Sequence, residues 1–299
     1  QVAACWRAMG EPRRFVVFEA GAASGRLAAD ILRSLRSAEP AAYEALRYVV
    51  QDVTLTADTA RDPLEAAGVP LDKVEVAAAL PASPEIEGVI LSNELLDALP
   101  FHRVRRRDGH LYELLTGLED GALQDVEAEP RPDLIAHFEA LGVQPGEGCD
   151  AEVSLAAPAW IRRAAGALQR GYVVTLDYGY EAADLYASWR KRGTLLTFYR
   201  HTSGDDPYAR IGRQDITASV DFTSVIRAGE EAGLTTVTFT TQSEFLAGLG
   251  IGEALAQPPL ADQLEAYYAL RKAVVELTDP AGLGRIRVLL QSRDVPSLT

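Results

Sequence analysis

The chain has 299 residues, of which 47% are hydrophobic and 24% charged, a balance typical of a soluble globular protein. Its net charge of −14 argues against a nucleic-acid-binding protein, whose interface would be basic. No apolar run approaches the roughly 20 residues that a membrane span needs. The two cysteines and four histidines lack metal-ligand spacing, and no signal peptide is visible, so we expect a reduced, cytoplasmic protein without a metal site.

Strand and helix patterns alternate along the chain, beginning with an amphipathic helix over residues 1–9. Because this helix starts abruptly and ends close to the first motif, we expect a natural N-terminal segment to be missing before it. A strand over 14–20 and a helix over 24–37 follow, with Ser24 placed to cap the helix. A later helical segment, 259–278, separates the last two strands. The remaining six strands are expected at 46–52, 74–79, 88–94, 171–179, 233–241 and 285–293.

This order predicts an α/β fold with a doubly wound, mostly parallel, seven-stranded sheet and helices on both faces. We expect residues 1–299 to form a single domain of this kind. Two segments, about 101–160 and about 180–220, are too long and irregular for plain connections. Long insertions are usually lids or binding loops, so these are predicted to form a lobe that handles substrate. The basic run 103–110 within the first alternates around Asp-Gly and predicts a solvated hairpin.

The first strand ends in Glu-Ala-Gly-Ala-Ala-Ser-Gly, residues 19–25. A dinucleotide-binding fingerprint would need glycine where Ala23 and Arg26 stand, and a P-loop would need Lys after Gly25, so both are excluded. The remaining pattern, acid-x-Gly-x-x-x-Gly, suits a ligand with a cationic amine and no phosphate. Glu19 would meet the amine, while Gly21 and Gly25 would let the backbone approach the ligand closely.

A second carboxylate, Asp52, falls at the end of the second strand, where it could accept the hydroxyls of a ribose. An amine and a ribose without a phosphate together describe S-adenosylmethionine. The alternative is that Glu19 and Asp52 are ordinary polar residues at strand ends.

The fourth strand leads into a polar run that presents Ser92, Asn93, Glu94 and Asp97 before Pro100. A buried strand that runs into an Asn, two carboxylates and a proline is unusual for a plain connection. The alternative is a helix start, with Asn93 as its cap and Asp97 in solvent.

With these motifs the sequence resembles the MidA-type methyltransferases. These form a class I, Rossmann-like, S-adenosylmethionine-dependent family that includes the mitochondrial complex I assembly factor with protein-arginine methyltransferase activity. The resemblance extends over essentially the whole chain, although family members usually carry a further N-terminal segment. It rests on "FEAGAASGRLAADIL" at 18–32, "SNELLDALPFHRV" at 92–104, "LDYGYEAADLY" at 176–186 and "GRQDITASVDFTSV" at 212–225.

The resemblance implies S-adenosylmethionine as cofactor and S-adenosylhomocysteine as product. By position, Glu19, Gly21, Ala23 and Gly25 would line the methionine end of the cofactor and Asp52 would hold its ribose. The same resemblance implies roles for two further sets of residues. Asn93, Glu94 and Asp97 would lie at the mouth where methyl transfer occurs, with Asn93 also touching the cofactor, and Gln214, Asp215 and Thr217 would form a loop that closes over the mouth.

Three positions depart from the family pattern. Ala23 replaces the middle glycine of the usual loop, which a methyl group permits only if the backbone avoids the left-handed region. Ser219 replaces a histidine that is common in the fourth stretch, and Arg213 replaces an acid. These changes leave the substrate open.

Three functions follow. The first is methylation of an arginine in a protein partner, because Glu94 and Asp97 could hold a planar guanidinium. The second is methylation of a small molecule, with His201 as the candidate base and a pocket roofed by aromatic residues between 186 and 199. The third is an assembly factor that keeps the fold but has lost turnover.

Overall fold

The computed structural model describes residues 1–200, 202–256, 264–296 and 298. This part of the chain divides into two compact units. The first consists of Gln1–Glu94, Arg162–Asp177 and Gly229–Thr299, and the second of Leu95–Ile161 and Tyr178–Ala228.

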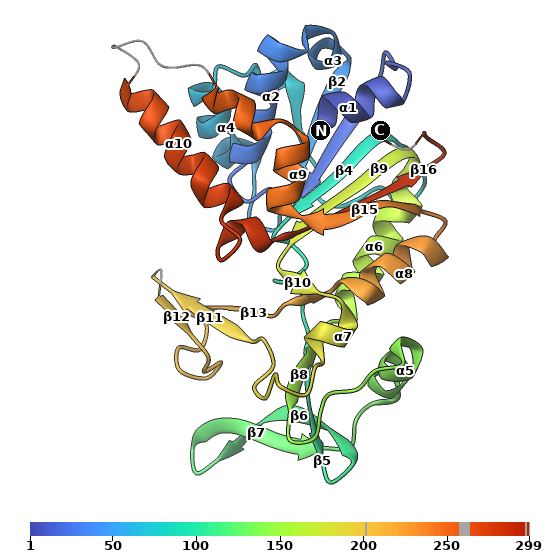
Figure 1. Cartoon of the computed structure of the whole chain (residues 1–299), viewed down its shortest axis with the longest axis vertical. Helices are drawn as coiled ribbons and strands as arrows, with labels where there is room; N and C mark the ends of the chain where they lie inside the picture. Colours follow the sequence, from blue (N-terminus) through green and yellow to red (C-terminus); the bar gives the residue numbers. More distant parts are fainter. Residues whose placement is uncertain (201, 257–263, 297, 299) are drawn as a thin grey trace. The chain divides into compact units, whose positions relative to one another are not determined.

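A seven-stranded sheet forms the centre of the first unit (Figure 1). Its order is β15-β16-β9-β4-β1-β2-β3, and β16 alone runs antiparallel to its neighbours. The chain winds from β1 outward to β2 and β3, then returns to β4 on the other side, which puts the topological switch point between β1 and β4. The predicted doubly wound sheet and all seven predicted strands are confirmed. The strands are β1 Phe15–Ala20, β2 Leu46–Gln51, β3 Val74–Val76, β4 Ile86–Asn93, β9 Leu168–Asp177, β15 Thr235–Thr241 and β16 Arg287–Arg293.

Both faces of this sheet are covered. On one face, Phe15 and Val17 of β1 belong to a core cluster that also contains Tyr48 of β2. On the opposite face, Phe18 and Ile90 are also buried. Strands that are buried on both faces appear in the sequence as nearly continuous apolar runs, which is why the pattern identified them.

Two glycines let the central strands approach one another. Gly88 lies in β4 with φ of 152°, and a Cβ atom there would lie 1.9 Å from the carbonyl oxygen of Val16. Gly171 of β9 has φ of 133°, and its Cβ atom would lie 1.9 Å from the carbonyl oxygen of Gly88. No side chain fits at either position without displacing backbone, so these two glycines are needed to close the sheet around the switch point.

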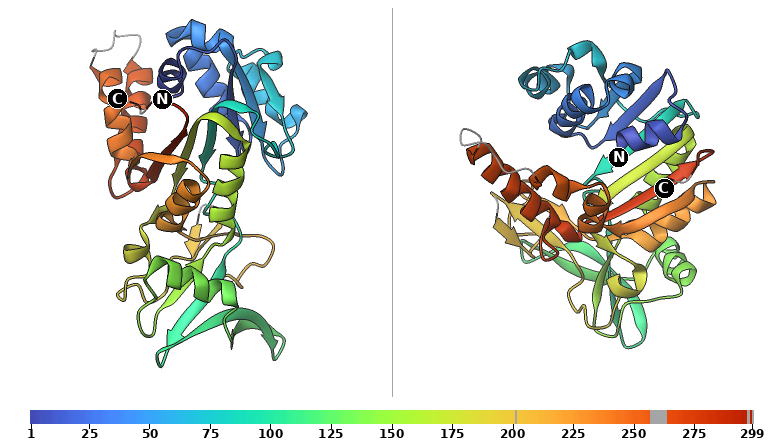
Figure 2. Two further views of the ribbon diagram at one scale, coloured as in Figure 1. Left: turned by 90° about the vertical axis from the view of Figure 1, so that its right-hand side faces the viewer. Right: turned by 45° about the horizontal axis from the view of Figure 1, so that its top comes forward.

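Helices α1, α2 and α3 contribute to the core on the face of the sheet that contains Phe15, and Figure 2 shows them beside the strands. The predicted cap at Ser24 is wrong, because α2 begins at Arg26 and Gly25 occupies its N-cap without a side-chain hydrogen bond. The helices of this unit are α1 Val2–Ala8, α2 Arg26–Ala38, α3 Pro40–Ala45, α4 Ala57–Ala66, α9 Gln242–Gly248 and α10 Leu264–Thr278, with short 3-10 turns at Leu71–Lys73, Ile251–Leu255 and Leu283–Arg285. Helices α6 Ala156–Ala167 and α8 Phe222–Glu231 each contain one boundary between the units.

The second unit is built on a four-stranded antiparallel sheet of order β7-β6-β5-β8. The predicted hairpin is confirmed: β5 and β6 are joined by Asp108 and Gly109, with φ of 53° and 77°, the signs that a two-residue type I′ turn requires. Smaller sheets, β12-β11-β13 and β10-β14, complete the unit. Its elements are β5 His102–Arg107, β6 His110–Glu119, β7 Ala122–Ala128, α5 Pro132–Leu141, β8 Asp150–Val153, β10 Gly179–Tyr180, α7 Ala182–Leu185, β11 Leu196–Tyr199, β12 Thr202–Gly204, β13 Asp215–Thr217 and β14 Val220–Asp221.

The second unit has its own core, in which Phe138 of α5 packs edge to face against Tyr186, with ring centroids 5.0 Å apart. Both segments expected as insertions, 101–160 and 180–220, fall within this unit. Their role as a lid over a single domain stays a prediction. In the described ranges, no helix combines the length and the apolar composition needed to cross a membrane.

Candidate functional site

The loop after β1 lies at the carboxyl edge of the parallel strands, beside the switch point. Gly21 and Gly25 both have positive φ, 72° and 79°. The N–H groups of Gly21 and Ala22 donate to the carbonyl oxygen of Gln51, at 2.8 and 3.0 Å, which fastens the loop to the end of β2. The loop therefore turns tightly from strand to helix with its backbone close to the place where α/β sheets bind ligands.

Ala23 also has positive φ, 46°, in the left-handed region. The expectation that alanine is permitted here only outside this region is therefore wrong. Its N–H donates to Oδ2 of Asp52 at 3.0 Å, a bond that helps to hold the conformation. A left-handed conformation costs an ordinary residue about 1–2 kcal/mol, so this loop contains strain that a glycine would relieve.

Asp52 follows β2 and fixes the loop from the neighbouring strand. Besides the bond from Ala23, its Oδ1 accepts the N–H of Thr54 at 2.9 Å and the hydroxyl of Thr54 at 2.8 Å. Burial by itself would raise the pKa of Asp52, but the hydrogen bonds from Thr54 and Ala23 outweigh it and lower the pKa. A carboxylate has about four acceptor positions, so roughly one remains for a ligand. If Asp52 also accepted both ribose hydroxyls, as predicted, these would share the carboxylate oxygens that already accept hydrogen bonds from the loop.

Glu19 is 3% exposed, and its Oε2 accepts the hydroxyl of the fully buried Tyr48 at 2.7 Å. Burial raises the pKa of Glu19 to about 7, with the Tyr48 hydroxyl acting in the opposite direction. A carboxyl group with this pKa is easily ionised by a nearby cation. We therefore expect the Glu19 carboxyl to become fully ionised when a cationic amine binds beside it.

The end of β4 lies next to β1 in the sheet, with Ser92 opposite Ala20. Asn93 closes the strand, and the exposed Glu94 follows with φ of 50°. The N–H of Glu94 donates to the carbonyl oxygen of Leu176 in β9 at 2.9 Å, and the side-chain amide of Asn93 donates to Glu94 Oε1 at 3.5 Å. No helix occurs between β4 and β5 in this described stretch, so the alternative of a helix capped by Asn93 is wrong.

The structure therefore brings one set of predicted residues together at the carboxyl edge of β1, β2 and β4: Glu19, Gly21, Ala23, Gly25, Asp52, Asn93 and Glu94. Asp97 belongs to the second unit, where its carbonyl oxygen accepts the N–H of Ala218 at 3.3 Å.

The remaining predicted residues also lie in the second unit. Gln214 donates its side-chain amide to the carbonyl oxygens of Asp206 and Pro207, at 2.9 and 3.0 Å, so it shapes its own loop. Asp215 is exposed and Thr217 half-buried, both in β13. His201 lies outside the described residues. The role of this group in closing over a site stays a prediction.

Three contributors were missed from the sequence. In the sequence, Tyr48 resembles an ordinary apolar residue of a strand. Tyr48 and Val50 are two positions apart, so their side chains lie on the same face of the strand, and this could have placed the Tyr48 hydroxyl near the first strand. The carbonyl oxygen of Gln51 belongs to the backbone, so no residue type in the sequence could indicate its role. Thr54 could have been found, because Asp-x-Thr is a common turn in which the Asp accepts from the residue two positions later.

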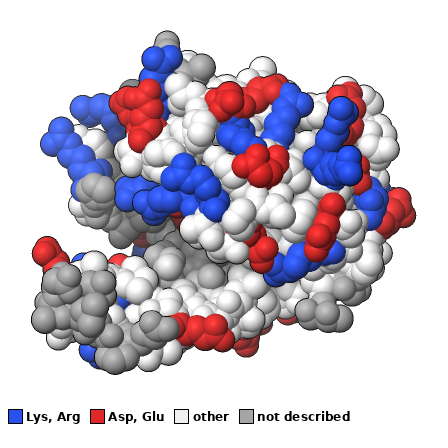
Figure 3. Space-filling view, turned by 90° about the horizontal axis from the view of Figure 1, so that it is seen from above, with Lys and Arg blue, Asp and Glu red and all other residues white. Residues whose placement is uncertain are grey.

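These observations fit a nucleoside with an amino-acid tail. The buried carboxyl of Glu19 suits an amine, and the turned loop exposes backbone to a ligand without supplying a lysine or arginine for phosphate. Among the described residues, no group of three or more His, Cys, Asp or Glu side chains is placed to hold a metal ion. On the face drawn in Figure 3, basic and acidic side chains lie interspersed rather than in one basic surface.

Comparison with known proteins identifies relatives of this arrangement. Residues 1–240 match the model of a family of S-adenosyl-L-methionine-dependent methyltransferases. A COG1565 superfamily member from Burkholderia thailandensis, whose crystal structure contains S-adenosyl-homocysteine, is 31% identical with a TM-score of 0.89, and the match covers 99% of this chain and 75% of that chain. A native structure of a COG1565 superfamily protein from the same organism matches at 31% identity with a TM-score of 0.90, over 99% of this chain and 78% of that chain. The protein arginine methyltransferase NDUFAF7 homolog, mitochondrial, of Drosophila melanogaster is 26% identical over 308 residues, which cover 93% of this chain and 67% of that protein.

Proposed function

The chain belongs to the family of S-adenosyl-L-methionine-dependent methyltransferases, and we propose that it transfers the methyl group to an arginine of a protein partner. Its cofactor is S-adenosylmethionine, which supplies an electrophilic methyl group on sulfur when bound. We assign Glu19 to the amine of the cofactor and the backbone of Gly21 to Gly25 to its methionine end. Asp52 would order that loop and offer its remaining acceptor position to the ribose.

The observation that carries the arginine assignment is the end of β4. Glu94 is an exposed carboxylate in a left-handed conformation that costs about 1–2 kcal/mol, at the strand next to the cofactor loop. Strained residues of this kind cluster at functional sites, where surrounding contacts hold them in place. Here the hydrogen bond from the Glu94 N–H to Leu176 provides such a contact.

The chemistry needs a guanidinium nitrogen aligned with the methyl group and relieved of a proton. A carboxylate accepts two parallel N–H bonds from a guanidinium, so Glu94 would orient the substrate and accept the proton that is lost. Asp97, the second carboxylate considered from the sequence, belongs to the other unit, and its part in this step stays a prediction. The relative from Drosophila melanogaster, named as a protein arginine methyltransferase homolog, supports this substrate class.

The second unit offers less support for a small-molecule substrate of the kind considered from the sequence. That hypothesis needs Tyr186, Trp189, Phe198 and Tyr199 to roof a pocket. Tyr186 is instead 4% exposed in the core against Phe138, whereas Trp189 is 67% exposed. The four residues therefore do not share one environment.

The test uses radiolabelled S-adenosylmethionine and a peptide library in which each member contains one arginine, with a matched library that contains lysine instead. We expect label on arginine peptides only. Glu94→Gln should lower turnover at least a hundredfold while the affinity for S-adenosylhomocysteine changes less than threefold, because the cofactor groups are untouched. Glu65→Gln, an exposed carboxylate of α4, is the control and should behave like the unaltered protein.

Label on lysine, or normal turnover by Glu94→Gln, would contradict the assignment. S-adenosylhomocysteine binding without any transfer by the unaltered protein would instead favour an assembly factor that has lost turnover.

We further propose that the protein works in a reducing compartment such as the cytoplasm. Both of its cysteines, Cys5 and Cys149, are free and buried. Burial raises the pKa of the Cys5 thiol to about 11, which keeps it protonated and unreactive. Cell fractionation tests this proposal, and recovery of the protein from an oxidising compartment would contradict it.

A further inference from the structure

The second unit contains a cavity of about 440 Å³ that the cofactor site does not use. Its walls come from two segments that are far apart in the sequence: β5 and β6 with the start of β7, and the stretch between Leu195 and Ile216. The lining residues are Phe101, His102, Arg103, Glu113, Leu114, Leu115, Thr116, Leu123, Leu195, Pro207, Tyr208, Ile211 and Ile216. This size is within the range of pockets that bind small ligands or a few side chains.

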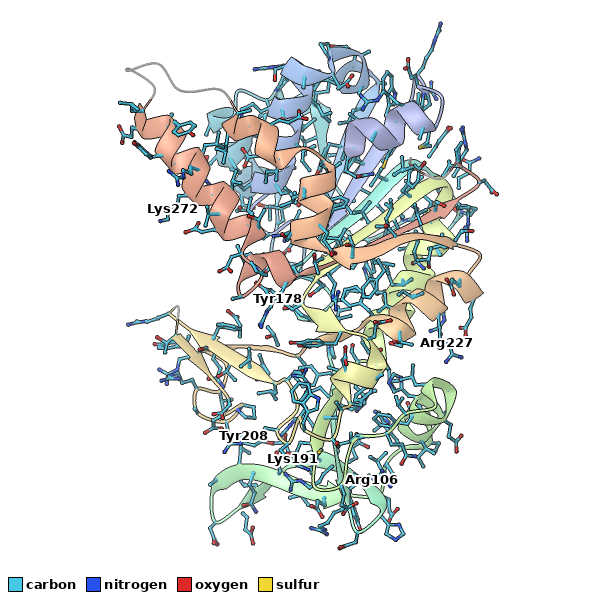
Figure 4. The ribbon with its side chains drawn as sticks, in the orientation of Figure 1. Arg106, Tyr178, Lys191, Tyr208, Arg227 and Lys272 are labelled. Atoms are coloured by element: carbon cyan, nitrogen blue, oxygen red, sulfur yellow. The ribbon has the colours of Figure 1, made fainter. Side chains whose placement is uncertain are left out.

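The two walls are fastened together by hydrogen bonds. Tyr208 lies in the segment that joins β12 to β13 and is labelled in Figure 4. It donates its hydroxyl to Oδ1 of Asp125 at 2.7 Å and lies 3.2 Å from the hydroxyl of Thr116. The loop that carries Pro207 and Tyr208 is in turn shaped by the side-chain amide of Gln214. The cavity is therefore formed before any ligand arrives.

The charged groups around this cavity already have partners. Arg103 pairs with Asp125 at 2.5 Å, and Nδ1 of His102 lies 3.0 Å from Oε1 of the buried Glu113. Burial alone would raise the pKa of Asp125, but the Tyr208 hydroxyl and the Arg103 guanidinium lower it, so the carboxylate is ionised and already paired. A cationic ligand would have to displace these partners.

Several apolar side chains of the lining are instead exposed to solvent. Ile211 is 64% exposed, Leu115 46% and Ile216 39%. Large apolar side chains that gather around a concave site and face solvent usually mark a place where another apolar group is buried. The site complements a neutral, apolar group.

We propose that this cavity, here called the apolar pocket, docks a large apolar side chain of the protein substrate, such as leucine or phenylalanine. This inference rests on the proposed function, because the occupant is assigned to the protein that is methylated. A docking residue away from the methylated arginine would add selectivity for particular partners without touching the reacting atoms.

The test observes the pocket directly by methyl NMR of protein labelled at isoleucine and leucine methyl groups. The probes are N-acetyl-L-leucinamide and N-acetyl-L-phenylalaninamide, with N-acetyl-L-argininamide as the cationic comparison. We expect the two apolar amides to shift the methyl signals of Ile211 and Ile216 with saturation at millimolar concentration, because a ligand with so few non-hydrogen atoms gains little binding energy in total. The signal of Ile135, exposed on α5 and outside the lining, should not move.

Ile211→Glu should weaken binding of the apolar amides at least tenfold. Leu118→Glu is the matched control, because Leu118 is 72% exposed in the same unit but does not line the pocket. Both positions are exposed, so neither change should prevent folding.

Equal or stronger shifts with N-acetyl-L-argininamide would overturn the inference, as would equal effects of the two glutamate variants. S-adenosylhomocysteine binding, measured by calorimetry on the same samples, separates the two proposals. Silent pocket signals with intact cofactor binding would refute the pocket alone, whereas lost cofactor binding would count against the proposed function.

Discussion

The carboxyl of Glu19 should make both stability and cofactor binding depend on pH. Burial raises its pKa from the ordinary 4.5 to about 7 in the folded protein. Between these pH values the folded protein holds a proton that the unfolded chain has released. The contribution of Glu19 to the free energy of unfolding is therefore largest below pH 4.5 and falls as the pH rises to about 7. A difference of this size corresponds to about 3 kcal/mol, all of it lost above pH 7.

Glu19→Gln removes this titration while keeping the shape and one acceptor for Tyr48. We expect the variant to match the unaltered protein near pH 4 and to exceed its free energy of unfolding by about 3 kcal/mol near pH 8. Urea denaturation at several pH values measures the difference. Glu65→Gln, an exposed carboxylate, serves as the control and should show no such window.

Binding of S-adenosylhomocysteine should follow the opposite trend. The amine of the ligand favours the ionised form of Glu19, so affinity should increase about tenfold from pH 6 to pH 8 as the carboxyl loses its proton. Calorimetry in buffers with different ionisation enthalpies should detect release of that proton near pH 6.5. Because the ligand's own amine also titrates, the comparison with Glu19→Gln isolates the part due to Glu19. An affinity difference between the two proteins that stays constant across this range would refute the reasoning.

Three further changes test the loop and the sheet. Ala23→Gly should raise the free energy of unfolding by about 0.5–1 kcal/mol, because it relieves the left-handed strain, although glycine also gives the unfolded chain more freedom. The same change should tighten S-adenosylhomocysteine binding. A less stable variant would show that the loop is not strained. Gly88→Ala should cost at least about 3 kcal/mol in urea denaturation because its Cβ atom would meet the carbonyl of Val16, whereas Gly166→Ala, exposed in α6 with open space around it, should be neutral or stabilising. Asp52→Asn should weaken S-adenosylhomocysteine binding at least tenfold in calorimetry, because an amide offers one acceptor oxygen where three donors now share two; unchanged affinity would remove Asp52 from the site.

The sheet could be predicted because its signal is repeated in every strand. Strands buried on both faces must be apolar along their length, and the turns after them must carry glycine or polar residues, so seven strands and the motif after β1 could be identified independently. The order of β15 and β16 at the edge could not be obtained in this way. It depends on which strand pairs with β9, a long-range choice with no local pattern.

The local conformations at the site were harder to predict, because several are set by the partners of a residue rather than by its own type. Ala23 is left-handed although alanine disfavours that region, and the bond to Asp52, 29 positions away, helps to hold it there. Glu94 is a similar case, because β9 supplies the acceptor for its N–H. Both residues violate a local preference at the carboxyl edge of the sheet, on either side of the switch point. Such violations are expected where a structure gives up stability for function, so the failures of prediction point to the same edge as the successes.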